Sequence, residues 1–464
     1  MNEWQTLTLA DVCTVITDGA HQSPKTVSRG KPMASVKDLT RFGVDLTSAR
    51  HIATEDFEAL VKQGCKPHVG DVLIAKDGNS ALDTVCTVDH PLDAVLLSSV
   101  AILRPDPKCL DSVFLKFYLS SPETIDYLKS NFISGAAIPR VVLRDFKRAE
   151  IRLPSLDVQR RIAGVLQSID SKIDLNRRVN QTLEAMAQAI FQSWFVEFDP
   201  VKAKIAAKQE GRDPLRAAMT AVSGKADAEL DALPPEQYEQ LAATAVLFPD
   251  EMEESELGEI PKGCIAGSLG DICNFTAGSA FSPEHQGSAG GDYPFIKVSD
   301  MNLVGNEVFI QSANNYVSQA RQLEMKAKLH PQGATVFAKI GVALISNRRR
   351  LLITPTIIDN NMMSASPIEG KSASYFLYSM LSTIDFNTLV SGTALPYLNV
   401  SDLRKIPIVR PLDGVCRAFE LKAASIFLMM QKLAAQSVTL ASVRDALLPK
   451  LLSGEIEVSG LDEG

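Results

Sequence analysis

The sequence predicts a mixed α+β protein made of two similar globular halves and two long helices that pack against each other. Three observations lead to this fold class: a heptad pattern in the middle of the chain, a second heptad pattern at its end, and short blocks that occur twice. The 464 residues, 45% of them hydrophobic, suffice for two or three domains with cores of their own.

The first heptad pattern covers residues 156–195, which contain no proline and one glycine. One series recurs every seven residues and a second series follows it four positions later. They are Ile162, Ile169, Asn176, Leu183 and Ile190, and Leu166, Ile173, Asn180, Ala187 and Trp194. An apolar seam of this period predicts a long helix packed along another helix. At 1.5 Å per residue this helix would extend about 60 Å, so it needs a partner of similar length.

The C-terminal part of the chain supplies that partner. Its apolar residues are also spaced by seven, and each follows a member of the first series by 257 residues: Phe419, Ile426, Leu433, Leu440 and Leu447. The constant offset indicates that the second helix is a copy of the first. Asn176 and Asn180 interrupt the first seam. They either fix the helix register, as a buried polar residue does in a coiled coil, or face solvent or a partner subunit.

Short blocks return in the same order in both halves of the chain, which is the signature of an internal repeat. They are LADVC and LGDIC at 9–13 and 269–273, KPMASVKDLTRFG and YPFIKVSDMNLVG at 31–43 and 293–305, GDVLIAKDG and GATVFAKIG at 70–78 and 333–341, FLKFYLS and FLYSMLS at 114–120 and 376–382, and ISGAAIP and VSGTALP at 133–139 and 390–396. The offset starts near 260, rises to 263 and settles at 257. Each copy is a globular part of about 150 residues followed by a long helix.

Local patterns place boundaries and elements within this repeat. GDVLIAKDG reads as an apolar strand between glycines, and residues 114–130 read as an amphipathic helix. A proline stands just before each predicted long helix, Pro154 before the first and Pro411 before the second. The predicted division is a globular domain at 1–154, a long helix at 155–198, an acidic linker with small helices at 199–262, a second globular domain at 263–411, and a long helix with a tail at 412–464.

Composition favours a soluble cytoplasmic protein. The seven cysteines are scattered and never form a CxxC pair, the six histidines are dispersed, and the N-terminus lacks the order of a secretory signal. We therefore expect reduced thiols, no metal site and no membrane contact. The net charge is −8, but residues 226–261 hold eleven acidic and no basic residues. Without those eleven charges the remainder carries +3, which is compatible with a local phosphate-binding face.

Motifs of enzymes that act on DNA are missing from the sequence. It contains no Asn/Asp-Pro-Pro-Tyr/Phe tetrapeptide for amino-methylation, since LPPE at 233–236 departs from that pattern. It also contains no GxxxxGK[ST] loop for ATP. We therefore expect a chain without catalysis of its own.

The order of globular domain, helix, globular domain and helix resembles the specificity (S) subunit of Type I restriction-modification systems. The most similar passages are DGAHQSPKTVSRGKPMASVKDL at 18–39, IPKG at 260–263 and RDALLPKLLSGEIEV at 444–458, while Cys264 stands where such subunits often carry tryptophan. The resemblance implies two target recognition domains, each of which reads one half of a split double-stranded DNA sequence. It implies that the two helices pack antiparallel as a spacer and dock two methyltransferase (M) subunits. It also implies a separate restriction and translocation (R) subunit where the system has one, no cofactor on this chain, and S-adenosylmethionine in the M subunits.

Basic and polar residues beside the repeated turns are the DNA-binding candidates, because Arg and Lys bind phosphates or guanine edges and Asn and Gln read adenine. In the first half they are His21, Gln22, Ser23, Lys25, Lys37, Arg140 and Arg144, and in the second half Ser279, Lys297, Arg348, Arg349, Arg350, Tyr397 and Asn399. For each residue alone, a solvated surface side chain is the alternative interpretation. The arginine triplet at 348–350 is the sharpest signal, because adjacent guanidiniums repel one another unless an anion is near. Lys76 and Lys339 share a position in the repeated strand and are either structural or bind phosphate.

We interpret the chain as a DNA specificity subunit that recognises a bipartite target and positions methyltransferase subunits on it. The alternative from another class is a coiled-coil scaffold that binds only proteins. Apolar residues off the heptad seam widen the apolar face of the helices and favour the docking of another protein in either case; examples are Val165, Val179, Met186, Phe427 and Val443.

Overall fold

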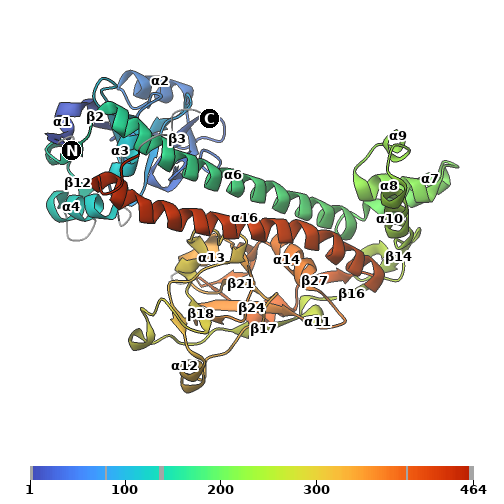
Figure 1. Ribbon diagram of the computed structural model, residues 1–464. Helices are drawn as coiled ribbons and strands as arrows, with labels where there is room; N and C mark the ends of the chain where they lie inside the picture. Colours follow the sequence, from blue (N-terminus) through green and yellow to red (C-terminus); the bar gives the residue numbers. More distant parts are fainter. Residues whose placement is uncertain (1–3, 79–80, 135–139, 393–395, 459–464) are drawn as a thin grey trace. The chain divides into compact units, whose positions relative to one another are not determined.

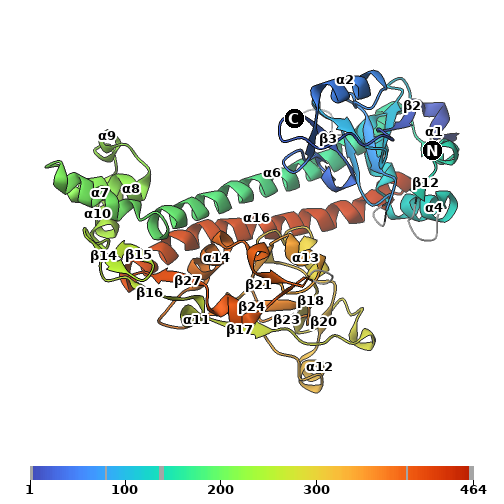
Figure 2. The same ribbon diagram turned by 180° about the vertical axis from the view of Figure 1, so that it is seen from behind.

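The computed structural model describes residues 4–78, 81–134, 140–392 and 396–458, and it forms two compact units. Unit 1 comprises residues 1–174 and 439–464, and unit 2 comprises residues 175–438. Each unit contains one globular half together with parts of both long helices, α6 (Leu156–Phe195) and α16 (Asp413–Ser453), as Figures 1 and 2 show from opposite sides. The predicted long helices are therefore confirmed. Parts of the repeated blocks ISGAAIP and VSGTALP, at 135–139 and 393–395, lie outside the described residues.

The globular half of unit 1 is built on a four-stranded antiparallel sheet of order β2-β10-β7-β8, formed by Cys13–Asp18, Val100–Pro105, Val72–Ala75 and Val85–Thr87. A second sheet of order β6-β3-β9 is formed by Arg50–Ile52, Lys31–Ala34 and Val95–Leu96. Small pairs join β1 (Gln5–Thr8) to β13 (Glu150–Leu153), β4 (Leu39–Thr40) to β5 (Gly43–Val44), and β11 (Ile133–Ser134) to β12 (Arg140–Val141). Its helices are α1 (Leu9–Val12), α2 (Thr54–Lys62), α3 (Ser112–Leu119), α4 (Pro122–Phe132) and α5 (Leu143–Phe146).

The globular half of unit 2 repeats this topology. Its main sheet has the order β17-β24-β21-β22-β19, formed by Cys273–Ala277, Met362–Pro367, Thr335–Ala338, Arg349–Leu352 and Phe309–Ile310. The second sheet, β20-β18-β23, contains Tyr316–Val317, Tyr293–Ile296 and Ile357–Ile358, and the small pairs are β16 (Ile265–Ser268) with β27 (Pro407–Arg410) and β25 (Val390–Ser391) with β26 (Tyr397–Leu398). Its helices are α11 (Leu269–Ile272), α12 (Gln319–Glu324), α13 (Val342–Ile345), α14 (Ser374–Thr383) and α15 (Val400–Arg404). Strand β19 has no counterpart in the main sheet of unit 1 within the residues that the structure describes. The order of the other strands is the same in both units, which confirms the duplication.

The repeated apolar block becomes the central strand of each main sheet. Strand β7 (Val72–Ala75) is buried along its whole length, as is β21 (Thr335–Ala338). Gly70 and Gly78 flank β7 with a backbone φ of 88° each, a conformation that favours glycine. Runs of apolar residues between such glycines form fully buried strands, as the sequence predicts.

Residues 114–130 differ from the single amphipathic helix that the sequence predicts. They form two helices, α3 and α4, which are divided at Ser120 and Ser121. The Ser121 side chain accepts a hydrogen bond from the backbone N–H of Thr124, and Pro122 occupies the first turn of α4. A serine cap followed by proline starts a helix and prevents the preceding one from continuing.

The two long helices pack antiparallel within each unit. In unit 2 the Phe191 ring of α6 lies 5.6 Å from the Phe419 ring of α16, while Asn180, which precedes Phe191, donates to the carbonyl oxygen of Met430, which follows Phe419. In unit 1 Ile162 shares a core with Leu448 and Leu451. The second predicted heptad series of α6 is buried throughout: Leu166, Ile173, Asn180, Ala187 and Trp194. Residues 257 positions later in α16 are also buried: Ala423, Met430, Ser437, Arg444 and Leu451.

Residues 199–262 form a compact helical insert within unit 2. It consists of α7 (Asp199–Gln209), α8 (Pro214–Ser223), α9 (Asp227–Leu230), α10 (Pro235–Val246) and the hairpin β14 (Met252–Ser255) with β15 (Gly258–Pro261). A small core of Ala218, Met219, Leu230 and Ala245 holds the helices together. The acidic stretch is therefore folded rather than extended.

One described helix, α16, is long and apolar enough by composition to cross a membrane. Its apolar length has another explanation, since Phe419, Phe427 and Met430 are buried in the core of unit 2 and Leu448 and Leu451 in the core of unit 1. We therefore assign α16 as a core helix of the protein.

Candidate nucleic-acid interface

A close backbone approach positions the candidate loop that follows the first strand of each main sheet. A Cβ atom added at Gly19 would lie 2.1 Å from the carbonyl oxygen of Leu96, and one added at Gly278 would lie 2.0 Å from the carbonyl oxygen of Asp359. Only glycine fits so close to another chain segment. The two glycines therefore place the loop of His21 and the loop of Ser279 at equivalent points of the repeat.

Charged side chains form a continuous polar strip next to this loop in unit 1. His21 Nε2 lies 3.1 Å from Asp18 Oδ1, and the other oxygen of Asp18 lies 3.1 Å from Lys76 Nζ. Lys76 Nζ is also 3.7 Å from Asp77, which accepts a hydrogen bond from Arg140 Nε at 3.0 Å. The strip thus joins His21 and Arg140, two predicted candidates that are 119 positions apart in the sequence.

The other candidates of unit 1 lie exposed around the loop and on short elements. Gln22, Ser23 and Lys25 are exposed in the loop, Lys37 is exposed on the turn that follows β3, and Arg144 is exposed on α5. No described contact joins Lys37 or Arg144 to the strip.

Arg50 is a contributor to this region that sequence reasoning missed. Its guanidinium donates to Ser23 Oγ at 2.8 Å and to the Pro24 carbonyl oxygen at 2.9 Å, so it holds the candidate loop against strand β6. Arg50 is 27 residues from Ser23 and belongs to no repeated block, so only the folded pairing of β3 with β6 reveals the contact.

The structure separates the three arginines at 348–350. Arg349 is 6% exposed, donates to the carbonyl oxygens of Asn347 and Ile384, and packs 4.1 Å from the Phe386 ring centroid. Burial lowers the pKa of Arg349 to about 10. Arg350 donates to the Met301 carbonyl oxygen at 3.1 Å, and Arg348 is exposed and bonds to Asn302. Backbone carbonyls and an amide therefore relieve the repulsion that the sequence implied, and Arg348 is the arginine most accessible to a ligand.

Lys339 differs from its equivalent in unit 1. The Asp18 carboxylate that pairs with Lys76 is replaced by Ala277 at the matching position of β17, and Asp77 is replaced by Ile340. Within the described part of the chain, Lys339 has no carboxylate within 4 Å. Lys76 is thus a paired, buried lysine, whereas Lys339 keeps an ammonium group available to an anion.

Of the remaining candidates of unit 2, Tyr397 lies beside Lys339, and Asn399, Lys297 and Ser279 make contacts of their own. The backbone of Tyr397 bridges to Ile340 beside Lys339, and the Tyr397 side chain is 46% exposed. The exposed Asn399 accepts a hydrogen bond from the Ser401 N–H at 3.2 Å and caps α15. Lys297 is half-buried, bonds to Gln286 and lies 5.5 Å from the Phe281 ring centroid. Ser279 is half-buried, and its hydroxyl accepts from the Lys328 N–H at 2.9 Å.

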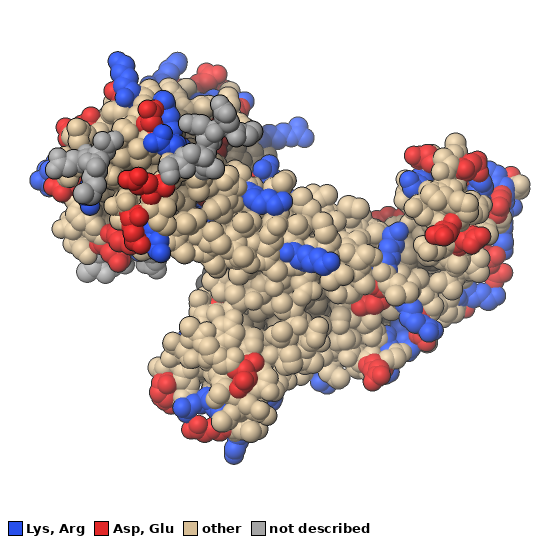
Figure 3. All heavy atoms as spheres, in the orientation of Figure 1, with Lys and Arg blue, Asp and Glu red and all other residues tan. Residues whose placement is uncertain are grey.

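The charges on this chain are mixed rather than uniformly basic. On the face drawn in Figure 3, basic and acidic side chains are interspersed on each globular half. Mixed donors and acceptors suit base reading, because carboxylates accept from cytosine and cations donate to guanine. Among the described residues, no three His, Cys, Asp or Glu side chains form a metal-binding group, and all seven cysteines are free.

Comparison with known proteins assigns the chain to a family. Residues 1–185 and 261–413 match the family model described as Type I restriction modification DNA specificity domain. The chain belongs to this family and is a DNA sequence-specificity subunit of a Type I restriction-modification system, a non-catalytic component of the enzyme complex. The predicted recognition, function class and absence of catalysis are therefore confirmed.

Two specificity subunits of named Type I restriction enzymes support the assignment, and one solved structure is also similar. The chain is 33% identical over 387 residues to the Type I restriction enzyme HindI specificity subunit of Haemophilus influenzae, a match that covers 80% of this chain and 83% of that one. It is 26% identical over 356 residues to the MjaIX specificity subunit of Methanocaldococcus jannaschii, covering 74% and 69%. The solved S subunit of a Type I system from M. genitalium matches with a TM-score of 0.46 and 16% identity, covering 97% of this chain and 96% of that chain.

Proposed function

We propose that this specificity subunit recognises a bipartite double-stranded DNA target. The globular domains at 1–154 and 263–411 would each read one half-site, and the paired helices would set the distance between the half-sites. The observation that carries the proposal is the duplicated topology, in which the same glycine places the same loop beside the main sheet of each half. Because both halves belong to one chain, their loops are free to diverge and to read different sequences.

The DNA-contacting set is the group of candidates named above, and their environments rank them. Exposed cations and polar groups come first, together with Lys339, whose ammonium group has no carboxylate within 4 Å among the described residues: Lys25, Arg140, Arg144, Lys339, Arg348 and Tyr397. Asp18 and Asp77 orient His21, Lys76 and Arg140, so they are proposed as positioning residues or as acceptors for base amino groups. Arg349 is proposed to hold the backbone at Asn347 and Ile384 in place rather than to contact DNA, since its guanidinium bonds to their carbonyl oxygens.

Apolar side chains on α16 supply a docking face for a methyltransferase subunit. Leu421, Leu428 and Met429 are 76%, 52% and 48% exposed, although they lie on a long helix of unit 2. Leu421 and Leu428 are seven residues apart and share one helix face. Next to Leu421 is an open groove of about 490 Å³ between the start of α16 and the loop before α14. Exposed apolar surface of this kind marks a protein interaction site.

Membership of the family supports a wider assembly. Two M subunits, together with R subunits where the system has them, would complete the enzyme, and the M subunits would bring S-adenosylmethionine to DNA in the cytoplasm. No residue of this chain is assigned to that cofactor. The rival function, a scaffold that binds only proteins, predicts that the complex of this chain with its M subunit binds duplex DNA no better than M alone.

Salt-dependent binding of the complex to its target duplex tests the DNA-contacting set. Lys339→Ala and Arg348→Ala should each weaken binding and reduce the slope of log K against log salt by up to ~0.9, because one phosphate contact is lost. Lys262→Ala is the matched control, since Lys262 is an exposed lysine of the insert that pairs with Glu251. Unchanged slopes and unchanged target preference in both test variants would remove these residues from the interface.

A further inference from the structure

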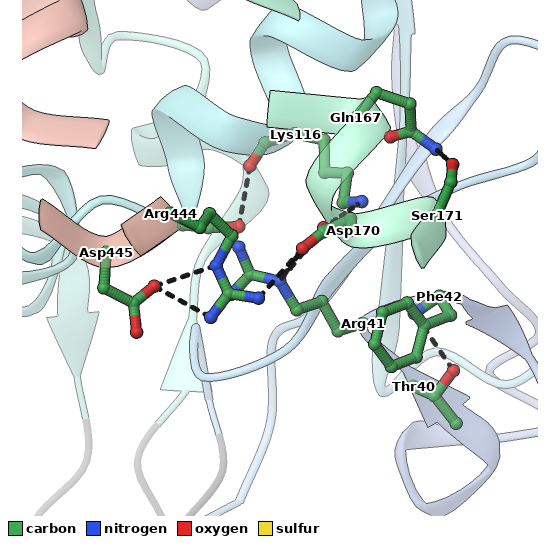
Figure 4. A network of polar contacts seen from close by, with 10 residues as sticks. Thr40, Arg41, Phe42, Lys116, Gln167, Asp170, Ser171, Arg444 and Asp445 are labelled. Carbon is green, nitrogen blue, oxygen red and sulfur yellow. Dashed lines mark hydrogen bonds and ion pairs between the residues drawn. The ribbon is translucent and has the colours of Figure 1, made fainter. Parts of the chain in front are cut away.

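A buried ionic cluster anchors the globular half of unit 1 to both long helices (Figure 4). Asp170 of α6 is 1% exposed and accepts hydrogen bonds from Lys116 Nζ at 2.9 Å and Arg444 Nη1 at 2.8 Å. Arg41 Nε, from the turn after β4, lies 3.2 Å from the same carboxylate. Lys116 belongs to α3 of the globular half and Arg444 belongs to α16, so one carboxylate joins α3, α16 and the turn after β4 to helix α6. We call these four residues the ionic anchor.

The charges of the ionic anchor depend on one another. Lys116 and Arg444 are nearly as buried as Asp170, with side chains that are 2% and 5% exposed. Burial by itself would raise the pKa of Asp170, but the neighbouring Lys116 and Arg41 hold that pKa below its usual value. A buried ion pair tolerates the loss of one partner poorly, because the other charge stays in a dry environment.

The equivalent place in unit 2 holds no ionic cluster but a group of aromatic rings. The repeated blocks align Lys116 with Tyr378, and the 257-residue offset aligns Asp170 with Phe427 and Arg444 with Ala187. The Phe427 ring stacks on Tyr375 at 4.4 Å and meets Tyr378 edge-on at 5.5 Å. Ala187 is 2% exposed in the same core. We call Ala187, Tyr375, Tyr378 and Phe427 the aromatic anchor.

A second difference concerns the capping of the helix that carries each anchor. In unit 1, α3 is capped by its own Asp111, which accepts from the N–H groups of Val113 and Phe114 at 2.9 Å each. In unit 2, the matching position is Ala373, which provides no side-chain cap.

The long helix α16 supplies the missing cap in unit 2. Glu420 accepts from the N–H groups of Tyr375 and Phe376 at 3.1 and 3.0 Å. The residue of α6 that corresponds to Glu420 is Ala163, which is buried at 5% exposure. The cap therefore comes from the globular half in unit 1 and from the long helix in unit 2.

We infer that each globular half fits only the part of the helix pair that it contacts in its own unit, so that neither half fits the position of the other. We call the part of the helix pair in unit 1 the first end and the part in unit 2 the second end. At the first end, the contacts that decide the fit are the ionic anchor and the Asp111 cap, which comes from the globular half itself. At the second end, they are the aromatic anchor and the Glu420 cap, which comes from α16. We call these contacts the key. This inference concerns the assembly of the chain and does not depend on which DNA the halves read.

Exchange of the halves would create specific conflicts. If the half with Tyr378 lay at the first end, Asp170 and Arg444 would lose the contact with Lys116. The N-terminus of α14 would then lie next to Ala163, which has no carboxylate to cap it. If the half with Lys116 lay at the second end, its ammonium would be buried beside Phe427, and Asp111 would meet Glu420 at one helix N-terminus. Each arrangement leaves a buried charge or a helix end without its partner, and both are costly.

Exchanges of recognition domains between relatives should follow the same key. A foreign domain should be accepted at the first end only if it carries a cation at the position of Lys116 and caps its own helix. A domain with an aromatic residue at that position and no internal cap should be accepted only at the second end.

A full-length chimera with two copies of the second half tests the key. Residues 265–410 replace residues 5–153, and both the parent and the chimera are prepared with and without Ala163→Glu, Asp170→Phe and Arg444→Ala, which convert the first end to the aromatic type. The thermal unfolding midpoint of all four chains is measured. In the parent, the three substitutions should lower the midpoint by about 10 °C, because they leave the buried Lys116 without its carboxylate partner and place a second carboxylate next to Asp111. In the chimera, the same substitutions should raise it by a similar amount.

The opposite sign in the two backgrounds is the decisive result. Substitutions that merely disturb packing would lower the midpoint in both chains, and substitutions without effect would leave both unchanged; either result overturns the inference. A chimera that stays insoluble with the converted helices overturns it as well, because those helices offer the second half the contacts it makes in unit 2.

Discussion

At the scale of single residues, the neighbours decide what a repeated side chain does. Lys76 and Lys339 occupy the same place in the repeat, and the sequence alone leaves both structural and phosphate-binding roles open. In the fold Asp18 and Asp77 surround Lys76, whereas Ala277 and Ile340 stand at those positions near Lys339. The same reasoning applies to Arg349, whose guanidinium is satisfied by carbonyl oxygens inside unit 2.

His330 makes the stability of unit 2 depend on pH. The ring is 1% exposed, its Nδ1 lies 2.7 Å from Ser364 Oγ, and its Nε2 has no partner among the described residues. Burial lowers the pKa of His330 from 6.5 to about 4. Between these values the unfolded chain binds a proton that the folded chain does not, so folding loses stability as the pH falls from 6.5 towards 4.

Urea unfolding at pH 7.5 and pH 5 measures this effect. The free energy of unfolding should be about 2 kcal/mol lower at pH 5 on account of His330, and His330→Gln should remove that part of the difference. Ser364 and the sheet around it remain in the variant, so a loss of stability that is equal at both pH values would reflect packing alone. A pH dependence unchanged by His330→Gln would show that other groups cause it.

At the scale of elements, the long helices are held in register by polar residues in an apolar seam. Asn176 and Asn180 are 1% and 7% exposed, so they face the partner helix and not solvent. Asn176 Nδ2 donates to Gln436 Oε1 at 2.9 Å and to Ser437 Oγ at 3.3 Å, and Asn180 Nδ2 donates to the Met430 carbonyl oxygen at 3.1 Å. A different register would bury these amides without partners, which supports the register hypothesis.

Asn176→Ala should lower the free energy of unfolding by about 1 to 2 kcal/mol, because Gln436 and Ser437 lose a buried partner. Chemical denaturation measured on the full-length chain gives the value. Gln181→Ala is the control on the exposed face of the same helix and should change stability by less than ~0.5 kcal/mol. Equal effects of the two substitutions would show that the buried amide does not specify the pairing.

The apolar residues outside the heptad seam divide into two groups at this scale. Phe427 is 1% exposed because the globular half of unit 2 covers it, so it does not belong to a docking face. Met186 and Val443 are 50% and 44% exposed and remain available to a partner. The heptad period identifies the side of a helix that meets the other helix, but it does not show what covers the remaining sides.

At the scale of the whole molecule, duplication predicts that specificity is modular. Replacing residues 1–154 by the same domain of a relative with a cation at position 116 should change one half of the methylated sequence and leave the other half intact. Mapping of methylated positions in the host genome provides the measurement. The reciprocal exchange of residues 263–411 should change only the other half, and a change of both halves in either exchange would refute modular reading.

By itself, the sequence determines the fold class, the repeat and the two long helices, because these features leave periodic or local signals. Heptad spacing and strands between glycines depend on residues close together in the chain, and the matching blocks are found by comparing two parts of the same sequence. The structure confirms each of these features. The prediction of a single helix at residues 114–130 was wrong, because the Ser121 cap and Pro122 divide this segment into two helices.

Only the tertiary structure decided which side chains became partners. Asp170 meets Arg444 across 274 positions and Lys116 across 54, and no pattern along the chain connects these three residues. Side-chain pairing in a folded protein depends on which segments the packing of apolar surface brings together, and a buried charge is tolerated only where such a partner arrives. For this reason, the two ends of one duplicated helix pair carry an ionic anchor and an aromatic anchor at the same position of the repeat.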